Sequence, residues 1–245
     1  MHAAAHVRVV VLAADAMPDR YAPVVARLWE GIEMGATVPD ELRFLWDVDD
    51  QVGVIARVLM HRCFMDSDKP RDRGCPIQIA RYATGIPGFF EDYARGELEG
   101  AYDDEEFVAN AGVYFGFVSH HIADLHSPPH VGKSLDAKAM GFRDRGRLHA
   151  RVEVDLDRAA RSICTIAPYR PTPIELTTET FELIAESVYY EAYLALPRAY
   201  GPKADAGLRE DLLCSCVRKA AQRTADVWAV VLGLVSPAGL RALVR

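Results

Sequence analysis

The chain has 245 residues, half of them apolar and 26% charged, which is the size and composition of one large globular domain. We therefore expect a single domain over residues 1–245. The formal net charge of −7 argues against a broad basic surface of the kind that binds nucleic acid. It does not argue against a pocket lined by metal ions, where the bound cations would be the dominant local charges.

The cysteine spacing predicts no disulfide framework, and the first residues do not resemble a signal peptide. The five cysteines form no CxxC pair and no regular pattern, which predicts buried thiols; they are Cys63, Cys75, Cys164, Cys214 and Cys216. The opening MHAAAHVRVVVLAADAM lacks the basic start and clear cleavage site of a signal peptide. We expect a cytoplasmic protein if Met1 is the native start, and otherwise an exported protein with its signal removed.

The apolar pattern is helical nearly throughout, which predicts an all-α fold. Two connectors separate the expected helices, a loop over Gly35–Asp40 (GATVPD) and a rigid extended linker over Ala167–Pro173. Gly35 is expected to end a helix in the usual way for a C-terminal glycine. In chain order, the expected helices cover about residues 6–14, 19–34, 41–64, 77–99 with breaks at Gly85, Pro87 and Gly88, 104–127, 147–163, 175–199 and 205–235.

The stretch Gly112–Gly132, GVYFGFVSHHIADLHSPPHVG, holds three metal-binding side chains in the pattern HxxxDxxxxxH. His120 and Asp124 are four residues apart, so on a helix they share one face and can point at one ion. Pro128 and Pro129 are expected to end the helix, and the turn is expected to bring His130 back towards the same helix. The neighbouring His121 points about 100° away and is not expected to be a ligand.

Other side chains complete a candidate ligand set. His149 and Glu153 form a second pair four residues apart, and His6, Asp40 and His61 are further candidates. Each has a simpler interpretation by itself: a core histidine for His6 or His61, a helix cap for Asp40, and a solvated pair for His149 and Glu153. Five of the eight histidines fall into one acid-paired pattern, so the joint interpretation as a metal site is preferred.

These residues resemble the zinc-dependent phospholipase C family, whose fold is shared with single-strand-specific zinc nucleases. SHHIADLHSPPH is similar to the central stretch of the family, and LHARVE (residues 148–153) to its HxxxE pair. GATVPD resembles the glycine-to-aspartate loop of the phospholipases, and AAHVRVVVL resembles the N-terminal ligand helix. MHRCFMDSD, around His61, is a looser match.

The resemblance implies an all-α helical bundle that binds up to three zinc ions. Asp40, His61, His120 and Asp124 would hold one ion, and Asp124 would bridge to a second ion held by His6 and the N-terminal residue, Met1. His130, His149 and Glu153 would hold the third, more open ion. Asp40 would also orient or deprotonate the attacking water, so that a metal-bridged hydroxide cleaves a phosphodiester.

The chain departs from the family in ways that leave alternatives open. The interval from Asp40 to His61 is longer than in secreted members, so Asp47 and Asp49 are rival candidates for the role of Asp40. Glu41 stands where choline-lipid enzymes carry an aromatic residue, which puts a phosphatidylcholine-type pocket in doubt.

The expected partner is a small phosphodiester or phospholipid, with at most transient membrane contact and no stable nucleic-acid partner. The alternative functions are a single-strand nuclease or 3′-nucleotidase of the same fold, a zinc-stabilised protein without catalysis, and a member repurposed for another reaction. For the nuclease, the candidate base-stacking aromatics are Tyr114, Phe115, Phe117 and Phe142.

Overall fold

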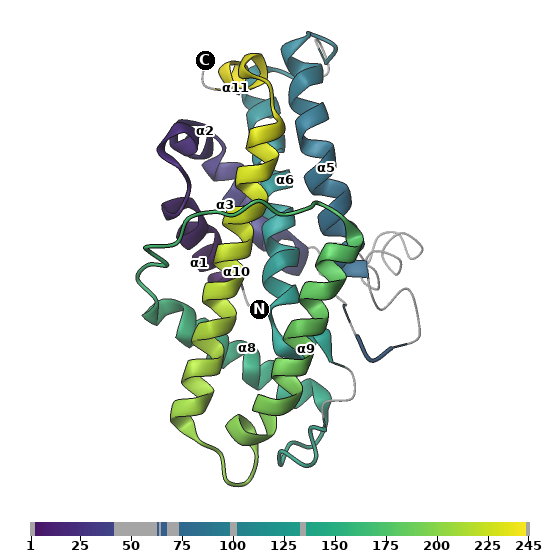
Figure 1. Ribbon diagram of the computed structural model, residues 1–245, viewed down its shortest axis with the longest axis vertical. Coiled ribbons are helices and arrows are strands. Elements are labelled where there is room, and N and C mark those ends of the chain that lie inside the picture. Colours follow the sequence, from purple (N-terminus) through teal and green to yellow (C-terminus); the bar gives the residue numbers. More distant parts are fainter. Residues whose placement is uncertain are drawn as a thin grey trace.

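The structure is a computed structural model that describes residues 3–41, 63, 65–67, 74–98, 102–132 and 136–243, with side chains in the first segment described over residues 4–37. Helices make up the ordered elements of these segments, and no strand occurs in them, which confirms the all-α prediction. Long helices pack into a bundle around α6, Asp104–Leu125, which contacts α1, α3, α5 and α10 (Figure 1).

The N-terminal part holds three α-helices and one short 3₁₀ turn. They are α1 (Ala3–Asp15), η1 (Asp19–Tyr21), α2 (Ala22–Arg27) and α3 (Trp29–Glu41). The single helix predicted over 19–34 is thus broken at Leu28. The predicted loop Gly35–Asp40 is wrong, because α3 continues through it to Glu41.

The close packing of α3 against α6 explains that error. Gly31 and Gly35 of α3 face Gly112 and Gly116 of α6, and a Cβ added at Gly35 would lie 2.2 Å from the carbonyl oxygen of Val113. A Cβ at Gly116 would likewise lie 2.2 Å from the carbonyl oxygen of Ile32. These glycines therefore allow two backbones to touch, and Gly35 serves this contact instead of ending the helix.

The helix predicted over 41–64 lies almost wholly outside the described residues. The later predicted helices occur in the expected order with shifted ends, and the short α7 (Pro128–Val131) was not predicted. The described helices after α3 are α5 (Gly74–Ala94), α6, α7, α8 (Arg145–Ser162), α9 (Thr178–Tyr200), α10 (Ala206–Leu234) and α11 (Pro237–Leu243). The breaks predicted in α5 are absent: Pro87 lies inside the helix, and Gly85 and Gly88 face open space. α11 was not predicted.

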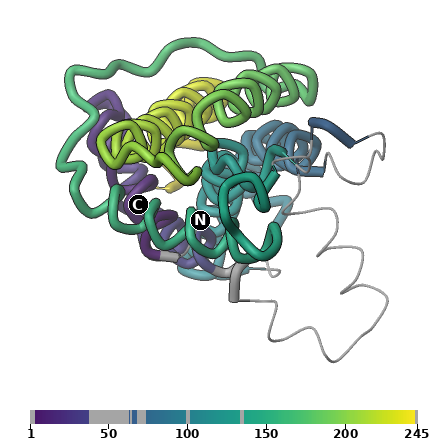
Figure 2. Tube along the Cα trace, turned by 90° about the horizontal axis from the view of Figure 1, so that it is seen from below, coloured from purple at the N-terminus to yellow at the C-terminus, as the bar shows by residue number. Residues whose placement is uncertain are grey.

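The linker between α8 and α9 crosses the outer face of α10, and Figure 2 shows α9 and α10 side by side. Asp226 of α10 fastens this linker, because its carboxylate accepts hydrogen bonds from the Tyr169 hydroxyl (2.5 Å) and the Thr172 amide (2.7 Å). No described helix by itself has the length and apolar character of a membrane span, although α10 and α11, bent by 112°, have them jointly.

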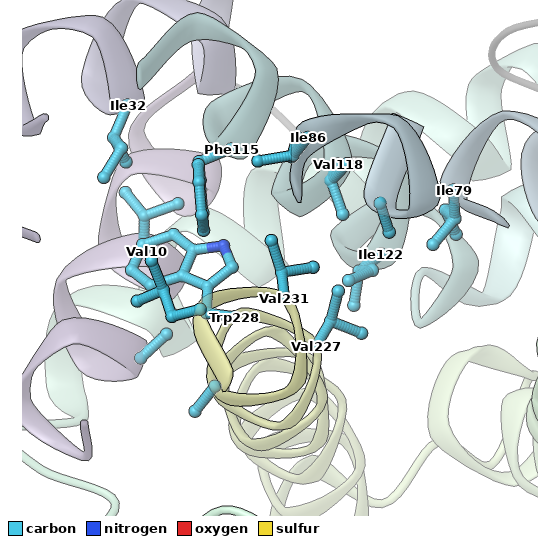
Figure 3. Packing of buried hydrophobic residues seen from close by; sticks show 14 of the residues in the cluster. Val10, Ile32, Ile79, Ile86, Phe115, Val118, Ile122, Val227, Trp228 and Val231 are labelled. Carbon is cyan, nitrogen blue, oxygen red and sulfur yellow. The ribbon is translucent and has the colours of Figure 1, made fainter. Parts of the chain in front are cut away.

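Two apolar clusters meet at α6 and α10. One surrounds Trp228, which packs among Val10, Ile32, Phe115 and Val231 (Figure 3). Its indole N–H donates to the Ser119 hydroxyl at 3.0 Å, directly beside His120. The second cluster lies between α1, α8, α9 and α10 and includes Val9, Leu148, Val152, Leu196 and Val217. The predicted metal ligands of α6 are therefore held by packed side chains on both sides.

The cysteine prediction is correct for three residues and wrong for two. Cys63, Cys75 and Cys216 are buried, whereas Cys164 is exposed and Cys214 is half-buried.

Candidate metal centre

The centre begins on the last two turns of α6, which place His120 and Asp124 on one face. A capping box at Asp103 fixes the start of this helix, and the prolines after Ser127 prevent it from continuing. His120 Nε2 lies 3.3 Å from Asp124 Oδ2, and both side chains are buried. The predicted pairing of these two residues is therefore present.

His6 joins this pair from α1. Its Nε2 lies 3.5 Å from Asp124 Oδ1, and its ring stacks on that of His120 with the centroids 4.0 Å apart. His6 is 1% exposed, so water has little access to it. Two helices far apart in the sequence thus deliver three ligand atoms to one buried point, which we call the buried triad: His6, His120 and Asp124.

The spacing within the buried triad fits a zinc ion. In a tetrahedral site with bonds of about 2.0–2.1 Å, neighbouring ligand atoms are about 3.3–3.4 Å apart. The measured separations from Asp124 to His120 and His6, 3.3 and 3.5 Å, are close to that value. They exceed the 2.7–2.9 Å that is usual for a charge-assisted hydrogen bond.

The tautomer of His120 also suits a cation. His120 Nδ1 lies 2.9 Å from the Ala36 carbonyl oxygen, which can only accept a hydrogen bond, so Nδ1 carries the proton. In the neutral ring, Nε2 then offers a lone pair towards the carboxylate of Asp124, and two acceptors face each other. A cation bound between them would be coordinated by both atoms, and the Ala36 carbonyl orients the ring in the way typical of zinc-bound histidine.

The turn after α6 carries the next ligand. α7 begins at Pro128, and its first turn closes with the His130 amide donating to the Ser127 carbonyl at 2.9 Å. This returns His130 to α6, with its Nδ1 3.5 Å from Asp124 Oδ2, as the sequence predicted. Arg145 of α8 donates to the Pro129 carbonyl at 2.6 Å and so ties the turn to the next ligand helix.

A second group of ligands forms around the other nitrogen of His130. His130 Nε2 lies 2.8 Å from His149 Nε2 and 3.3 Å from Glu153 Oε1, and His149 Nε2 lies 2.8 Å from that same oxygen. The side chain of His149 is 37% exposed and that of Glu153 15% exposed. We call this group the open triad: His130, His149 and Glu153.

The pKa shifts of four of the six side chains favour uncharged imidazoles at His6 and His130 and ionised carboxylates at Asp124 and Glu153, the charge states that bind a metal. Burial and the nearby His120 hold the pKa of His6 well below its ordinary value, and burial lowers the pKa of His130. Burial alone would raise the pKa of Asp124, but the neighbouring His130 holds that pKa well below its ordinary value. Hydrogen bonds from His130 and His149 likewise overcome burial and lower the pKa of Glu153.

No family model matches the sequence, and no curated protein matches it. Solved structures do share its fold. Alpha toxin from Clostridium absonum matches with a TM-score of 0.58 at 12% identity, over 95% of this chain and 65% of the toxin. Alpha-toxin from the avian Clostridium perfringens strain SWCP matches with a TM-score of 0.53 at 11% identity, over 94% of this chain and 62% of the toxin.

The chain therefore spans less than two thirds of the toxins it matches, and the likeness shows the fold alone.

Six of the predicted ligands are brought together in the two triads. Met1 and His61, and the rival candidates Asp47 and Asp49, lie outside the described residues. Asp40 belongs to the last turn of α3, and its side chain lies outside the described part.

Sequence reasoning missed the backbone support of His120. The Ala36 carbonyl reaches that ring because α3 lies directly on α6 at the glycine contact. The spacing of four between Gly31 and Gly35, and between Gly112 and Gly116, was a signal that could have indicated it.

Proposed function

We propose that this chain is a zinc-dependent phosphodiester hydrolase of the phospholipase C type. The observation that carries the proposal is the convergence of six metal-binding side chains from α1, α6, α7 and α8 on two adjacent triads. A solvated histidine–glutamate pair or a single core histidine would not produce this arrangement. The shared fold with the clostridial alpha-toxins is consistent with the resemblance of the motifs.

Zinc bound in these triads would supply Lewis acidity and lower the pKa of a coordinated water to near 7. The chain's own residues hold the two positions at a fixed distance from each other. Asp124 is central to this, because its two carboxylate oxygens face His6 on one side and His120 and His130 on the other. His130 in turn faces both triads, one through each ring nitrogen.

The open triad offers three protein ligands and a partly exposed edge. A metal position with three protein ligands leaves a vacancy that a phosphoryl oxygen or leaving group can occupy. The buried triad has less contact with solvent, so its residues are suited to binding a metal ion that does not exchange with water. By the resemblance, Asp40 remains the candidate that orients or deprotonates the attacking water, with Asp47 and Asp49 as rivals.

The nuclease alternative gains no support from the aromatic residues named for it. Phe115 is buried against Trp228, and Tyr114 packs with Tyr82 and Phe89 on the outer side of α5 and α6. Phe142 packs against Tyr200, and Phe117 packs edge-on against Tyr82 and His121. A small phosphodiester or a phospholipid therefore remains the proposed substrate class.

The test combines metal analysis with a substrate panel. Protein prepared without chelator is expected to contain at least two zinc ions per chain by elemental analysis. It should hydrolyse bis(p-nitrophenyl) phosphate or phospholipid vesicles, with Asp124→Asn as the inactive control. Asp40→Asn, Asp47→Asn and Asp49→Asn, compared at full zinc loading, identify the catalytic aspartate.

Three results would separate the alternatives. Fewer than two zinc ions per chain would contradict the proposal. Zinc loading with cleavage only of single-stranded nucleic acid and 3′-phosphates would favour the nuclease. Zinc loading without hydrolysis of any substrate would favour a zinc-stabilised binding protein or a repurposed site.

A further inference from the structure

Two polar contacts join α1 to α8 on either side of His6. The amide of Ala5, the residue before His6, donates to Asp157 Oδ1 of α8 at 3.1 Å. Three residues further along α1, the guanidinium of Arg8 donates through Nε to the Ile163 carbonyl at 3.0 Å and through Nη2 to the Cys164 carbonyl at 3.1 Å. We call Asp157 and Arg8, with these contacts, the α1–α8 clamp.

Each half of the clamp satisfies a helix end that has no partner within its own helix. Ala5 is the third residue of α1, and the first four amides of a helix lack an intrahelical acceptor. Asp157 therefore caps α1 from a different helix, with a negative charge at the positive end of the helix dipole.

Arg8 acts in the reverse direction at the end of α8. Ile163 is the C-terminal cap of α8, and the carbonyls of Ile163 and Cys164 lie at the negative end of that helix dipole. The cation on α1 thus stabilises the end of α8, while the anion on α8 stabilises the start of α1.

The clamp lies next to both triads along the chain. On α1 it brackets His6 of the buried triad. On α8, Asp157 is four residues after Glu153 and eight after His149, so it continues the helix face that carries the open triad. The same two helices therefore carry the clamp and ligands of both triads.

Apolar packing alone would not fix this arrangement closely enough. α1 contacts its neighbours through Val9, Leu12 and similar side chains, and such contacts are not directional. Metal ligands need to be held within about 0.5 Å of their working positions. Directed hydrogen bonds at both ends of the α1–α8 contact can supply that precision.

We propose that Asp157 and Arg8 are positioning residues, which set α1 against α8 and so hold His6 at the distance from Asp124 that the buried ion requires. The inference rests on the metal centre of the proposed function and is independent of the substrate. Loss of a residue that supports a metal ligand typically weakens metal binding about 10–100-fold.

The experiment measures zinc binding and stability together. Asp157→Ala and Arg8→Ala are compared with the wild type by competition with a chromogenic chelator, and by thermal unfolding with and without zinc. Each variant is expected to bind the more tightly held zinc at least about 10-fold more weakly. The rise in Tm that zinc produces is expected to shrink accordingly.

A matched control separates positioning from stability. The Asp205 carboxylate accepts from the Leu208 amide at 3.1 Å, so it also caps a helix at the same distance as Asp157, but it caps its own helix, α10, which carries no ligand of either triad. Asp205→Ala is expected to lower Tm equally with and without zinc. Asp157→Asn, which keeps an oxygen acceptor for Ala5, is expected to recover part of the zinc affinity lost in Asp157→Ala.

Two results would overturn the inference. If Asp157→Ala and Arg8→Ala lower Tm equally with and without zinc and bind zinc as the wild type does, the clamp has only a structural role. If Asp157→Ala does not fold, the same comparison is made with Asp157→Asn and Arg8→Lys, and unchanged zinc affinity in both would again refute it. The zinc content of the wild type separates the failure of this inference from the failure of the proposed function. If the wild type binds zinc and the variants bind it equally well, only the inference is refuted. If the wild type binds no zinc, the proposed function is refuted as well.

Discussion

The buried triad and the open triad use the same donors, two imidazoles and one carboxylate, in different surroundings. His6, His120 and Asp124 are each at most 1% exposed, whereas the side chain of His149 is 37% exposed. The buried ligands come from long helices packed on both sides, and the open ones from a short turn and one face of α8. The difference suits the two triads to different roles, although their ligand types are the same. A metal ion in the buried triad would be shielded from water, whereas one in the open triad could exchange a ligand with solvent.

The largest expected effect comes from removing the residue that both triads face. Asp124→Asn keeps the size of the side chain but removes its charge, and its amide nitrogen cannot bind a metal. Zinc affinity is expected to fall by more than about 100-fold at the buried triad, with loss of hydrolysis. Isothermal titration with zinc measures this, and two zinc ions bound with unchanged affinity would show that Asp124 is not shared.

His149→Ala removes a ligand from the open triad and leaves the buried triad intact. Because His149 contacts His130 and Glu153 and no residue of the buried triad, one zinc ion should be lost and the remaining bound zinc retained. Elemental analysis after gel filtration should show one zinc ion fewer than in the wild type. His6→Ala is the matched substitution in the buried triad, and equal zinc losses with equal rates of chelator extraction would contradict the distinction.

Gly116→Ala tests whether the α3–α6 contact supports the buried triad. The added Cβ meets the backbone of Ile32 and Ala36, so the helices must separate, at a cost of about 2–3 kcal/mol in the free energy of unfolding. The Ala36 carbonyl should then move away from His120, weakening zinc binding. Denaturant unfolding, with and without zinc, measures both effects.

Gly85→Ala is the control for that substitution. Gly85 lies within α5 with open space around its Cα, so alanine should stabilise the protein by about 0.5–1 kcal/mol and leave zinc affinity unchanged. Equal behaviour of the two glycine variants would show that the helix contact has no special role.

His126 is a buried histidine outside both triads, so it shows how burial acts on a histidine that is not a predicted metal ligand. Its Nδ1 donates to the Ile122 carbonyl at 2.8 Å, and burial, with smaller contributions from Arg223 and Lys219, lowers its pKa from 6.5 to about 4. The unfolded chain therefore takes up this proton below about pH 6.5, while the folded chain takes it up only near pH 4. Stability from this group is present above pH 6.5 and is lost as the pH falls, by up to about 3 kcal/mol.

His126→Asn keeps a donor for Ile122 but cannot titrate. Its free energy of unfolding should fall less steeply between pH 6.5 and 4 than that of the wild type, with unchanged zinc content at pH 7. Denaturant unfolding of the metal-free proteins across this range measures the difference, and parallel curves would show that His126 is already protonated or exposed in the folded state.

Much of the fold could be predicted because helical periodicity is local. The helix that carries His120 and Asp124 was placed correctly, because its start and its end depend on residues close by in the sequence, the cap at Asp103 and the proline at Pro128. The end of α3 was not, because Gly35 serves a contact with α6 that local patterns do not record. The continuity of α5 through Pro87 was missed for a similar reason, as surrounding packing outweighs a single lost hydrogen bond.

The sequence by itself determined which donors are present and which share a helix face, because a spacing of four residues has one meaning on a helix. Only the tertiary structure decided that His6 lies beside Asp124 and His149 beside His130, that one triad is buried and the other open, and that the Ala36 carbonyl orients His120. Those features depend on how separate helices pack, and packing distances of a few ångströms arise from contacts between residues far apart in the chain.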